Sequence, residues 1–342
     1  MVVIGREGES GPTARLGHYR ARDGSRGARV DLDLDGPHAG LVVGKRGTGK
    51  SYTLGVLAEA LAESDGVAPV VVDPMGGFAG LAAGDTPATV VEPRVRAGSL
   101  APREWCALLG LDPERGAGSL LWRAASRHDT LQAMCRWVES ADADRSIRRA
   151  TTNHLALAAD WDVFDPDGLD AAGLDGPGAT VLDLSGRARR PASAVLAAVA
   201  TALYEGRVDG TTTRLPWLLV DEAHAFTDGV AAGPLRRLVT RGHQPGVSLW
   251  LATQRPSALP TVAVSQADLH LTHRLTSRAD IEALAAAHPT YLDGDWATRL
   301  PEAPGEALVV DDTTESVHHV RVRERRTPHG GGSPRASAVV DP

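Results

Sequence analysis

Residues 44–51 have the types and spacing of a phosphate-binding loop. They read Gly-Lys-Arg-Gly-Thr-Gly-Lys-Ser, the G-x-x-x-x-G-K-S pattern in which glycines let successive backbone N–H groups turn toward the phosphates of a nucleotide. Lys50 would reach the β- and γ-phosphates, and the Ser51 hydroxyl would hold Mg²⁺. The loop therefore predicts a site for ATP and Mg²⁺, formed by Gly44, Lys45, Arg46, Gly47, Thr48, Gly49, Lys50, Ser51 and Tyr52.

The flanks of the loop separate this interpretation from a chance match in a chain with 37 glycines. An apolar run at residues 41–43 leads in as a buried strand. After the loop, Leu54, Leu57 and Leu61 repeat at helical spacing. Strand, loop and helix in this order are the context that the motif requires.

A second motif supplies paired carboxylates. Residues 217–220 are apolar and run into Asp221 and Glu222, the pattern of a Walker B strand. Asp221 would hold the water shell of Mg²⁺ opposite Ser51. Glu222 would polarise the attacking water as general base. An apolar run that ends in Asp-Glu is common by itself, but with the loop upstream it indicates ATP hydrolysis.

Two more polar residues end predicted strands. Asp73 follows a buried run at residues 69–72 and would contact the Mg²⁺ shell or the attacking water; the alternative is that it caps its own strand. Gln254 follows the apolar strand at residues 247–252 and would contact the γ-phosphate as a sensor of hydrolysis.

An arginine from a neighbouring subunit stabilises transition-state charge in ring ATPases. Arg241 is our first candidate for this role and Arg255 the second. The alternative is that either one is an ordinary surface arginine.

The order of the predicted elements gives an α/β fold with a mainly parallel central sheet. We divide the chain into a short N-terminal extension with one short exposed strand at 30–34, a core in two parts, a helical insertion and a flexible tail. The boundaries are 1–36 for the extension, 37–95 and 179–326 for the core, 96–178 for the insertion and 327–342 for the tail.

The insertion at residues 96–178 is where the pattern changes from strands to helices. Helices are expected at 100–111, 120–127, 130–140 and 147–161. Its tryptophans are interpreted as local core, with base stacking as the alternative. They are Trp105, Trp122, Trp137 and Trp161.

Composition limits the classes of function. A net charge of −7 argues against a protein coated with nucleic-acid-binding surface, although a local basic channel remains compatible with it. The basic cluster at 186–190 fits a solvated turn better than a grip on a phosphate backbone. Residues 1–10 lack the apolar segment of a signal peptide, and no uncharged stretch is long enough to span a bilayer. Two cysteines give no disulfide framework. We therefore expect a cytoplasmic protein without membrane insertion.

The order of the motifs resembles the HerA/FtsK group of P-loop ATPases, and within it the HerA-like branch. The matching segments are spread over nearly all of residues 36–332, with the helical insertion matched least. They are residues 44–51, 73–76, 183–186, 220–224, 252–256, 265–268 and 273–277, with 320–323 and 329–331 at the end.

This resemblance implies a RecA-like core in a homo-hexameric ring that threads double-stranded DNA, with ATP and Mg²⁺ at the subunit interfaces. It implies an ATP-hydrolysing DNA translocase in which Lys50, Asp221 and Glu222 act in catalysis and Gln254 is the sensor. A nuclease or another protein would be a further partner. The string at 221–224 also resembles a DEAH-box helicase, but such helicases carry two RecA domains in one chain.

The chain departs from the family pattern at three places. Only residues 1–36 precede the core, so the N-terminal β-barrel that helps to recruit a nuclease is expected to be absent, which puts that partner in doubt. The family often has Gly-Arg before the strand that ends in Gln-Arg-Pro, whereas this chain has Gly242 and His243, with Arg241 just before them. Gly77 stands where relatives often carry an acid. Two other functions stay open: an ATPase for protein secretion or remodelling, and a nucleotide-sensing subunit of a larger complex.

Overall fold

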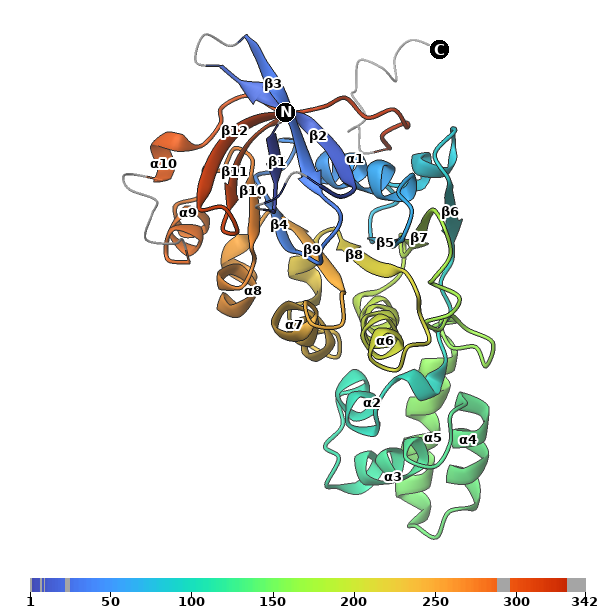
Figure 1. Ribbon diagram of the computed structural model, residues 1–342. Helices are drawn as coiled ribbons and strands as arrows, with labels where there is room; N and C mark the ends of the chain where they lie inside the picture. The colour runs from blue at the N-terminus through green and yellow to red at the C-terminus, as the bar shows by residue number, and fades with distance from the viewer. Residues whose placement is uncertain (1, 7, 9, 22–24, 288–295, 331–342) are drawn as a thin grey trace, which may run out of the picture.

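The computed structural model describes residues 2–6, 8, 10–21, 25–287 and 296–330. Its strands are β1 (Val2–Ile4), β2 (Thr13–Arg20), β3 (Arg26–Asp33), β4 (Ala39–Val43), β5 (Val67–Asp73), β6 (Ala88–Val91), β7 (Ala179–Asp183), β8 (Leu215–Val220), β9 (Ser248–Thr253), β10 (Leu269–Thr272), β11 (Glu306–Asp311) and β12 (Ser316–Val322). Across these described residues the strands form one sheet in the order β1-β3-β2-β12-β11-β10-β4-β9-β8-β5-β7-β6 (Figure 1).

One half of the sheet is parallel. It runs from β10 through β4, β9, β8, β5 and β7 to β6, and each neighbouring pair is parallel. Strands covered on both faces are expected to be apolar throughout, and β5 is buried along its whole length. The predicted α/β fold with a mainly parallel central sheet is confirmed.

The other half of the sheet is antiparallel and includes the N-terminal residues. From β10 the strands β11, β12, β2 and β3 pair antiparallel, and β1 then joins β3 in parallel. The predicted strand at 30–34 exists, but its predicted exposure is wrong, because Val30 and Leu32 are fully buried. They pack in the same apolar cluster as Leu57 and Leu61 of the helix after the phosphate-binding loop. The N-terminal residues are therefore part of the main sheet.

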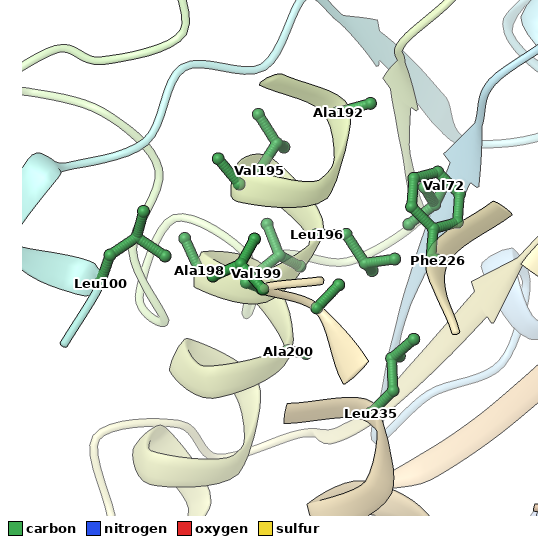
Figure 2. Close-up of a cluster of buried hydrophobic side chains, with 14 of the residues drawn as sticks. Val72, Leu100, Ala192, Val195, Leu196, Ala198, Val199, Ala200, Phe226 and Leu235 are labelled. Atoms are coloured by element: carbon green, nitrogen blue, oxygen red, sulfur yellow. The ribbon is translucent and has the colours of Figure 1, made fainter. Parts of the chain in front are cut away.

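Helices cover both faces of the sheet. On one face, α1 (Lys50–Ala62) packs on an apolar cluster that contains Val42 and Val71. Alternate residues of the same strands, such as Val43 and Val72, point to the opposite cluster. That second cluster includes residues of α6 (Arg189–Val208), α7 (Ala232–Arg241) and α8 (Thr261–Ser265), which lie in a row in Figure 1. Figure 2 shows side chains of α6 meeting Val72, Phe226 and Leu235.

The insertion forms a group of helices beyond α6, at the far end of the molecule from β3 in Figure 1. They are α2 (Pro102–Leu109), α3 (Gly116–Ala125), α4 (Leu131–Ser140) and α5 (Arg145–Ala159). Trp105 is fully buried there, and its indole N–H donates to the Ala97 carbonyl over 3.0 Å. Trp122 is 43% exposed, so it is not core as we expected. Arg123 and Arg127 each lie 5.3 Å from the ring centre of Trp137.

The end of the described chain packs on the body of the fold. The helices α9 (Arg278–Ala285) and α10 (Trp296–Arg299) precede β11. Thr327, predicted to begin a flexible tail, is buried, and its backbone N–H donates to Glu59 on α1 over 2.9 Å. The predicted flexibility of 331–342 lies outside the described residues. Among the helices that the structure describes, none has the length and apolar character needed to cross a membrane.

Candidate functional site

The phosphate-binding loop connects β4 to α1 at the carboxyl end of the parallel strands. Gly47 and Gly49 have φ of 79° and 118°, in the left-handed region that glycine adopts without strain. The loop is anchored to the segment that follows β10, the strand beside β4, because the Lys45 N–H donates to the Arg274 carbonyl over 2.8 Å. The backbone of the loop thus requires glycine at these two positions of the motif, 47 and 49.

The buried side chain of His273 contacts the first turn of the helix that follows the loop. His273 lies 2.7 Å from the Glu306 carbonyl through Nδ1 and 2.9 Å from the Thr53 hydroxyl through Nε2. A carbonyl can only accept, so Nδ1 carries the proton and Nε2 accepts from Thr53. Burial lowers the pKa of His273 to about 4, which keeps the ring neutral. The first turn of α1 is thereby tied to β10 and β11 by uncharged bonds.

Lys50 lies inside the loop and is 6% exposed. Its Nζ donates to the Lys45 carbonyl over 3.2 Å. Burial lowers the pKa of Lys50, while the nearby carboxylates of Glu222 and Asp221 act to raise it. The lysine and the paired acids therefore share one site, as the motifs predicted.

The two motifs meet directly at Ser51 and Asp221. The serine hydroxyl donates to Asp221 Oδ2 over 2.7 Å. Burial raises the pKa of Asp221 from its ordinary 3.8 to about 6; the charge of Glu222 also raises it, and the Ser51 hydrogen bond acts against the shift. A buried carboxylate with this pKa gains more from a bound cation than a solvated one would.

Glu222 follows directly and has a strained backbone, with φ of 47° and ψ of 40°. This left-handed conformation is rare for residues other than glycine and is often found at functional sites. Glu222 Oε2 lies 3.4 Å from the Gln254 amide nitrogen and 3.2 Å from His224 Nδ1. Gln254 therefore lies beside Glu222 at the tip of β9, and its role as a sensor stays a prediction. The contact of His224 was not predicted, although its place two residues after Glu222 puts it within reach.

The carboxylate of Asp73 is engaged by the turn after its own strand. Its carboxylate accepts three backbone hydrogen bonds, from Met75 over 3.2 Å, Gly77 over 3.1 Å and Phe78 over 2.8 Å. The residue is 1% exposed. This is the strand-end cap that was the alternative, because its oxygens already satisfy the turn after β5. We therefore leave Asp73 out of the magnesium site.

The remaining predicted residues are not gathered at the site: Arg241 lies at the amino end of the parallel strands, just before β9, and Arg255 lies at their carboxyl end, just after β9. Arg241 ends α7 and is exposed, and Arg255 follows β9 and is exposed as well. Neither guanidinium forms an ion pair with any residue that the structure describes. Tyr52 turns away from the loop toward the end of the chain: its hydroxyl accepts from the Arg325 N–H over 2.6 Å, and its ring meets His329 edge-on.

The oxygen atoms at this site fit magnesium better than metals that need a full protein cage. Within the described ranges, no three His, Cys, Asp or Glu side chains gather to hold a metal. Mg²⁺ is usually held by one or two protein groups together with water and phosphate oxygens. The hydroxyl of Ser51 and the carboxylate of Asp221 match that pattern.

Comparison with known proteins agrees with these motifs. Residues 14–156 match the family model described as the central domain of the helicase HerA. No curated protein matches the sequence.

Solved structures share the fold over most of the chain. VirB4 of Thermoanaerobacter pseudethanolicus is 16% identical with a TM-score of 0.68, and the match covers 93% of this chain and 98% of VirB4. An unbound form of the bacterial conjugative coupling protein TrwB is 15% identical with a TM-score of 0.58, over 95% and 92% of the two chains. TrwB in complex with ADP and Mg²⁺ is 15% identical with a TM-score of 0.57, over 85% and 86%. These matches confirm the predicted fold, and the resemblance to HerA is supported by the family model over residues 14–156.

Proposed function

We propose that this chain, a P-loop ATPase of the HerA/FtsK type, hydrolyses ATP with Mg²⁺. The observation that carries the proposal is the 2.7 Å contact between Ser51 and Asp221, beside Glu222 and Lys50. One serine hydroxyl, one lysine and two acids at the mouth of a phosphate-binding loop are the parts that phosphoryl transfer to water requires.

Each residue has a separate task in the proposed reaction. The backbone N–H groups of residues 44–51 hold the phosphates, and Lys50 neutralises charge on the γ-phosphate. Ser51 and Asp221 would hold Mg²⁺, which would supply positive charge against the β- and γ-phosphates. Glu222 takes the proton of the attacking water. Gln254, whose amide nitrogen lies 3.4 Å from Glu222 Oε2, would contact the γ-phosphate and act as the sensor of hydrolysis.

The arginine that completes the site comes from a neighbouring subunit in this proposal. Arg241 remains the first candidate and Arg255 the second. Their exposure and lack of carboxylate partners within the described chain support a role at an interface. We accordingly propose a homo-hexamer with ATP between subunits.

We further propose that the ring translocates double-stranded DNA in the cytoplasm. The match to the HerA central domain supports this, as does the fold shared with a conjugative coupling protein. The alternatives are an ATPase that drives protein secretion or remodelling, which the likeness to VirB4 keeps open, and a nucleotide-sensing subunit of a larger complex. A nuclease or other protein partner belongs to the same proposal.

The first test is ATP hydrolysis by the purified chain, alone, with duplex DNA and with an unfolded peptide. Stimulation by DNA supports the translocase, and stimulation by the peptide alone supports the secretion alternative. Glu222→Gln should bind ATP and not hydrolyse it. Hydrolysis by this variant at the wild-type rate would show that Glu222 is not the base.

The second test is the mass of the assembly with ATP, with and without duplex DNA. A hexamer that gains the mass of one duplex is expected. A monomer under both conditions would contradict the ring and remove the reason to seek an arginine from a neighbour.

A further inference from the structure

A cavity lies away from the candidate ATP site, between the antiparallel half of the sheet and the far end of α1. Its volume is about 700 Å³. It is bordered by β2, by the end of β12 with the segment that follows, and by the last turn of α1. The lining residues are Thr13, Ala14, Arg15, His18, Arg26, Ala60, Glu63, Ser64, Arg321, Val322, Arg323, Glu324 and Arg326. We call this cavity the basic groove.

The charge of the basic groove is opposite to that of the chain. Five arginines line it against two glutamates, a balance of +3 for the lining residues, which falls to +1 when Glu59 and Glu306, the partners of two of these arginines, are counted; the whole chain carries −7. Neutral lining residues are small or aliphatic, with His18 as the one ring. A positive hollow on an acidic protein selects anions.

Three of the five arginines are held by carboxylates. Arg321 lies 3.7 Å from Glu306, Arg323 lies 2.7 Å from Glu59, and Arg326 lies 2.6 Å from Glu63. These ion pairs fix the wall of the groove. Because these three arginines are paired, the uncompensated positive charge of the groove comes from the other two arginines.

Arg15 on β2 and Arg26 on β3 are the two that remain. Both are exposed, and neither forms an ion pair with a residue in the described part of the chain. Their guanidinium groups are therefore available to a ligand.

His18 shows that the arginine charges converge. It lies directly across from Arg321 in the pairing of β2 with β12. Burial lowers the pKa of His18, and the charges of Arg26, Arg321 and Arg15 lower it further. Three guanidinium groups from three strands thus act on one point in the groove.

We propose that the basic groove binds the phosphate backbone of a nucleic acid, with Arg15 and Arg26 as the residues that contact phosphate. The planar fork of arginine fits phosphate oxygens in pairs. The lining has no Phe, Tyr or Trp on which a base could stack. Contacts of this kind position a duplex without reading its sequence.

Binding at the basic groove would add a DNA contact to the proposed function. This proposal rests on that function only for the choice of DNA as the nucleic acid. Ala60, Glu63 and Ser64 of the groove belong to the last turn of α1 or follow it directly, and the same helix begins at Lys50 in the ATP site. A backbone bound in the groove would therefore touch the helix that carries the phosphate-binding loop.

The test is binding of a labelled duplex oligonucleotide, measured by fluorescence anisotropy over a series of salt concentrations without nucleotide. Arg15→Gln with Arg26→Gln should bind about tenfold more weakly, and the slope of log K against log salt should fall by about 2, because each of the two arginines neutralises one phosphate. The matched control is Arg115→Gln with Arg278→Gln, which removes the same charge from side chains that are 87% and 92% exposed. Equal thermal unfolding midpoints of the two variants show that the fold is kept.

Two results would overturn the proposal. One is equal affinity and equal salt slope for the groove variant and the control. The other is binding of inorganic tripolyphosphate at the groove with no binding of duplex, which would make the ligand a small polyanion. Because the assay contains no ATP, failure here leaves the Glu222→Gln test of hydrolysis untouched, and failure of that test leaves the groove untouched.

Discussion

Ser51 donates a 2.7 Å hydrogen bond to Asp221 across 170 positions of sequence. Ser51 is in the first turn of α1, which follows β4, and Asp221 directly follows β8. The two strands are separated in the sheet by β9 alone, which ends near Gln254. Parallel strands bring their carboxyl ends to one edge, so three distant segments meet at the candidate ATP site.

Replacing Asp221 with Asn should stabilise the protein while it abolishes hydrolysis. The pKa of Asp221 is raised from 3.8 to about 6, mainly by burial. A raised pKa means that the folded state favours the proton, so this contribution to stability is complete below pH 3.8 and is lost as the pH rises through about 6. At pH 7.5 the ionised carboxylate therefore costs roughly 3 kcal/mol, at 1.36 kcal/mol for each unit of pKa, and Asn removes that cost.

Denaturant unfolding at two pH values checks this prediction. The gain in unfolding free energy should be about 2–3 kcal/mol at pH 7.5 and should shrink to about 1 kcal/mol near pH 4.5. A gain that is equal at both values would show that the carboxylate is not the cause.

His224→Ala should lower kcat of ATP hydrolysis about ten- to a hundredfold with little change in KM, because a base displaced by about 1 Å loses that much rate. The imidazole Nδ1 lies 3.2 Å from Glu222 Oε2 and 3.2 Å from the Thr253 hydroxyl, so the ring limits where the base can lie. His224→Asn, whose amide can still donate to Glu222, should recover part of the rate.

The matched control for this variant is His243→Ala, which removes an exposed imidazole. Steady-state kinetics over a range of ATP concentrations separate kcat from KM. A large rise in KM with unchanged kcat would place His224 in ATP binding and contradict its role beside the base.

Local sequence patterns predicted the motifs and most of the core strands, because their signals lie within a few residues. The loop at 44–51 and the paired acids after β8 are such signals, and Gln254 was expected at the tip of β9, where it lies 3.4 Å from Glu222. The predicted helix at 130–140 is observed as α4, Leu131–Ser140. Apolar periodicity is enough for these elements.

The parts that were missed depend on contacts between distant residues. β2 is polar and irregular, with register shifts near Arg15 and His18, so its sequence has no clear alternation. Glu59 lies in α1 as if on a helix surface, yet it is fully buried because Arg323 and Thr327 reach it from the end of the chain. The capping role of Asp73 could not be chosen over a magnesium role, since both place an acid at a strand end.

Trp105→Ala should cost about 3–5 kcal/mol in unfolding free energy, the usual penalty for removing a buried tryptophan. The side chain is fully buried, donates to the Ala97 carbonyl and lies 4.8 Å from the ring centre of Phe164. Trp122→Ala in the same helical group should cost about 1 kcal/mol or less, because that ring is 43% exposed. Denaturant titration of both variants checks the difference. Equal losses would show that the insertion lacks the core described above.

Glu59→Gln should destabilise the protein by about 3 kcal/mol at neutral pH, since it leaves buried donors without their charged partner. Glu59 accepts from Arg323 over 2.7 Å, and from the Thr327 N–H and hydroxyl over 2.9 and 2.7 Å. Burial acts to raise the pKa of Glu59, but the hydrogen bonds of Thr327 and Arg323 outweigh it and lower the pKa below 4.5. A lowered pKa gives stability that is present above pH 4.5 and is lost as the pH falls through the folded-state value.

Glu63→Gln is the control, because it removes the same charge from the same end of the same helix. Glu63 pairs with Arg326 at a side chain that is 42% exposed, and such pairs contribute about 0–1 kcal/mol. At pH 7 the unfolding free energy of the Glu59→Gln variant should therefore be lower than that of the Glu63→Gln variant by about 2 kcal/mol or more. On acidification the separation should narrow, because wild-type Glu59 becomes protonated and resembles Gln. A separation that stays constant down to pH 3 would mean that shape, and not charge, holds the end of the chain on α1.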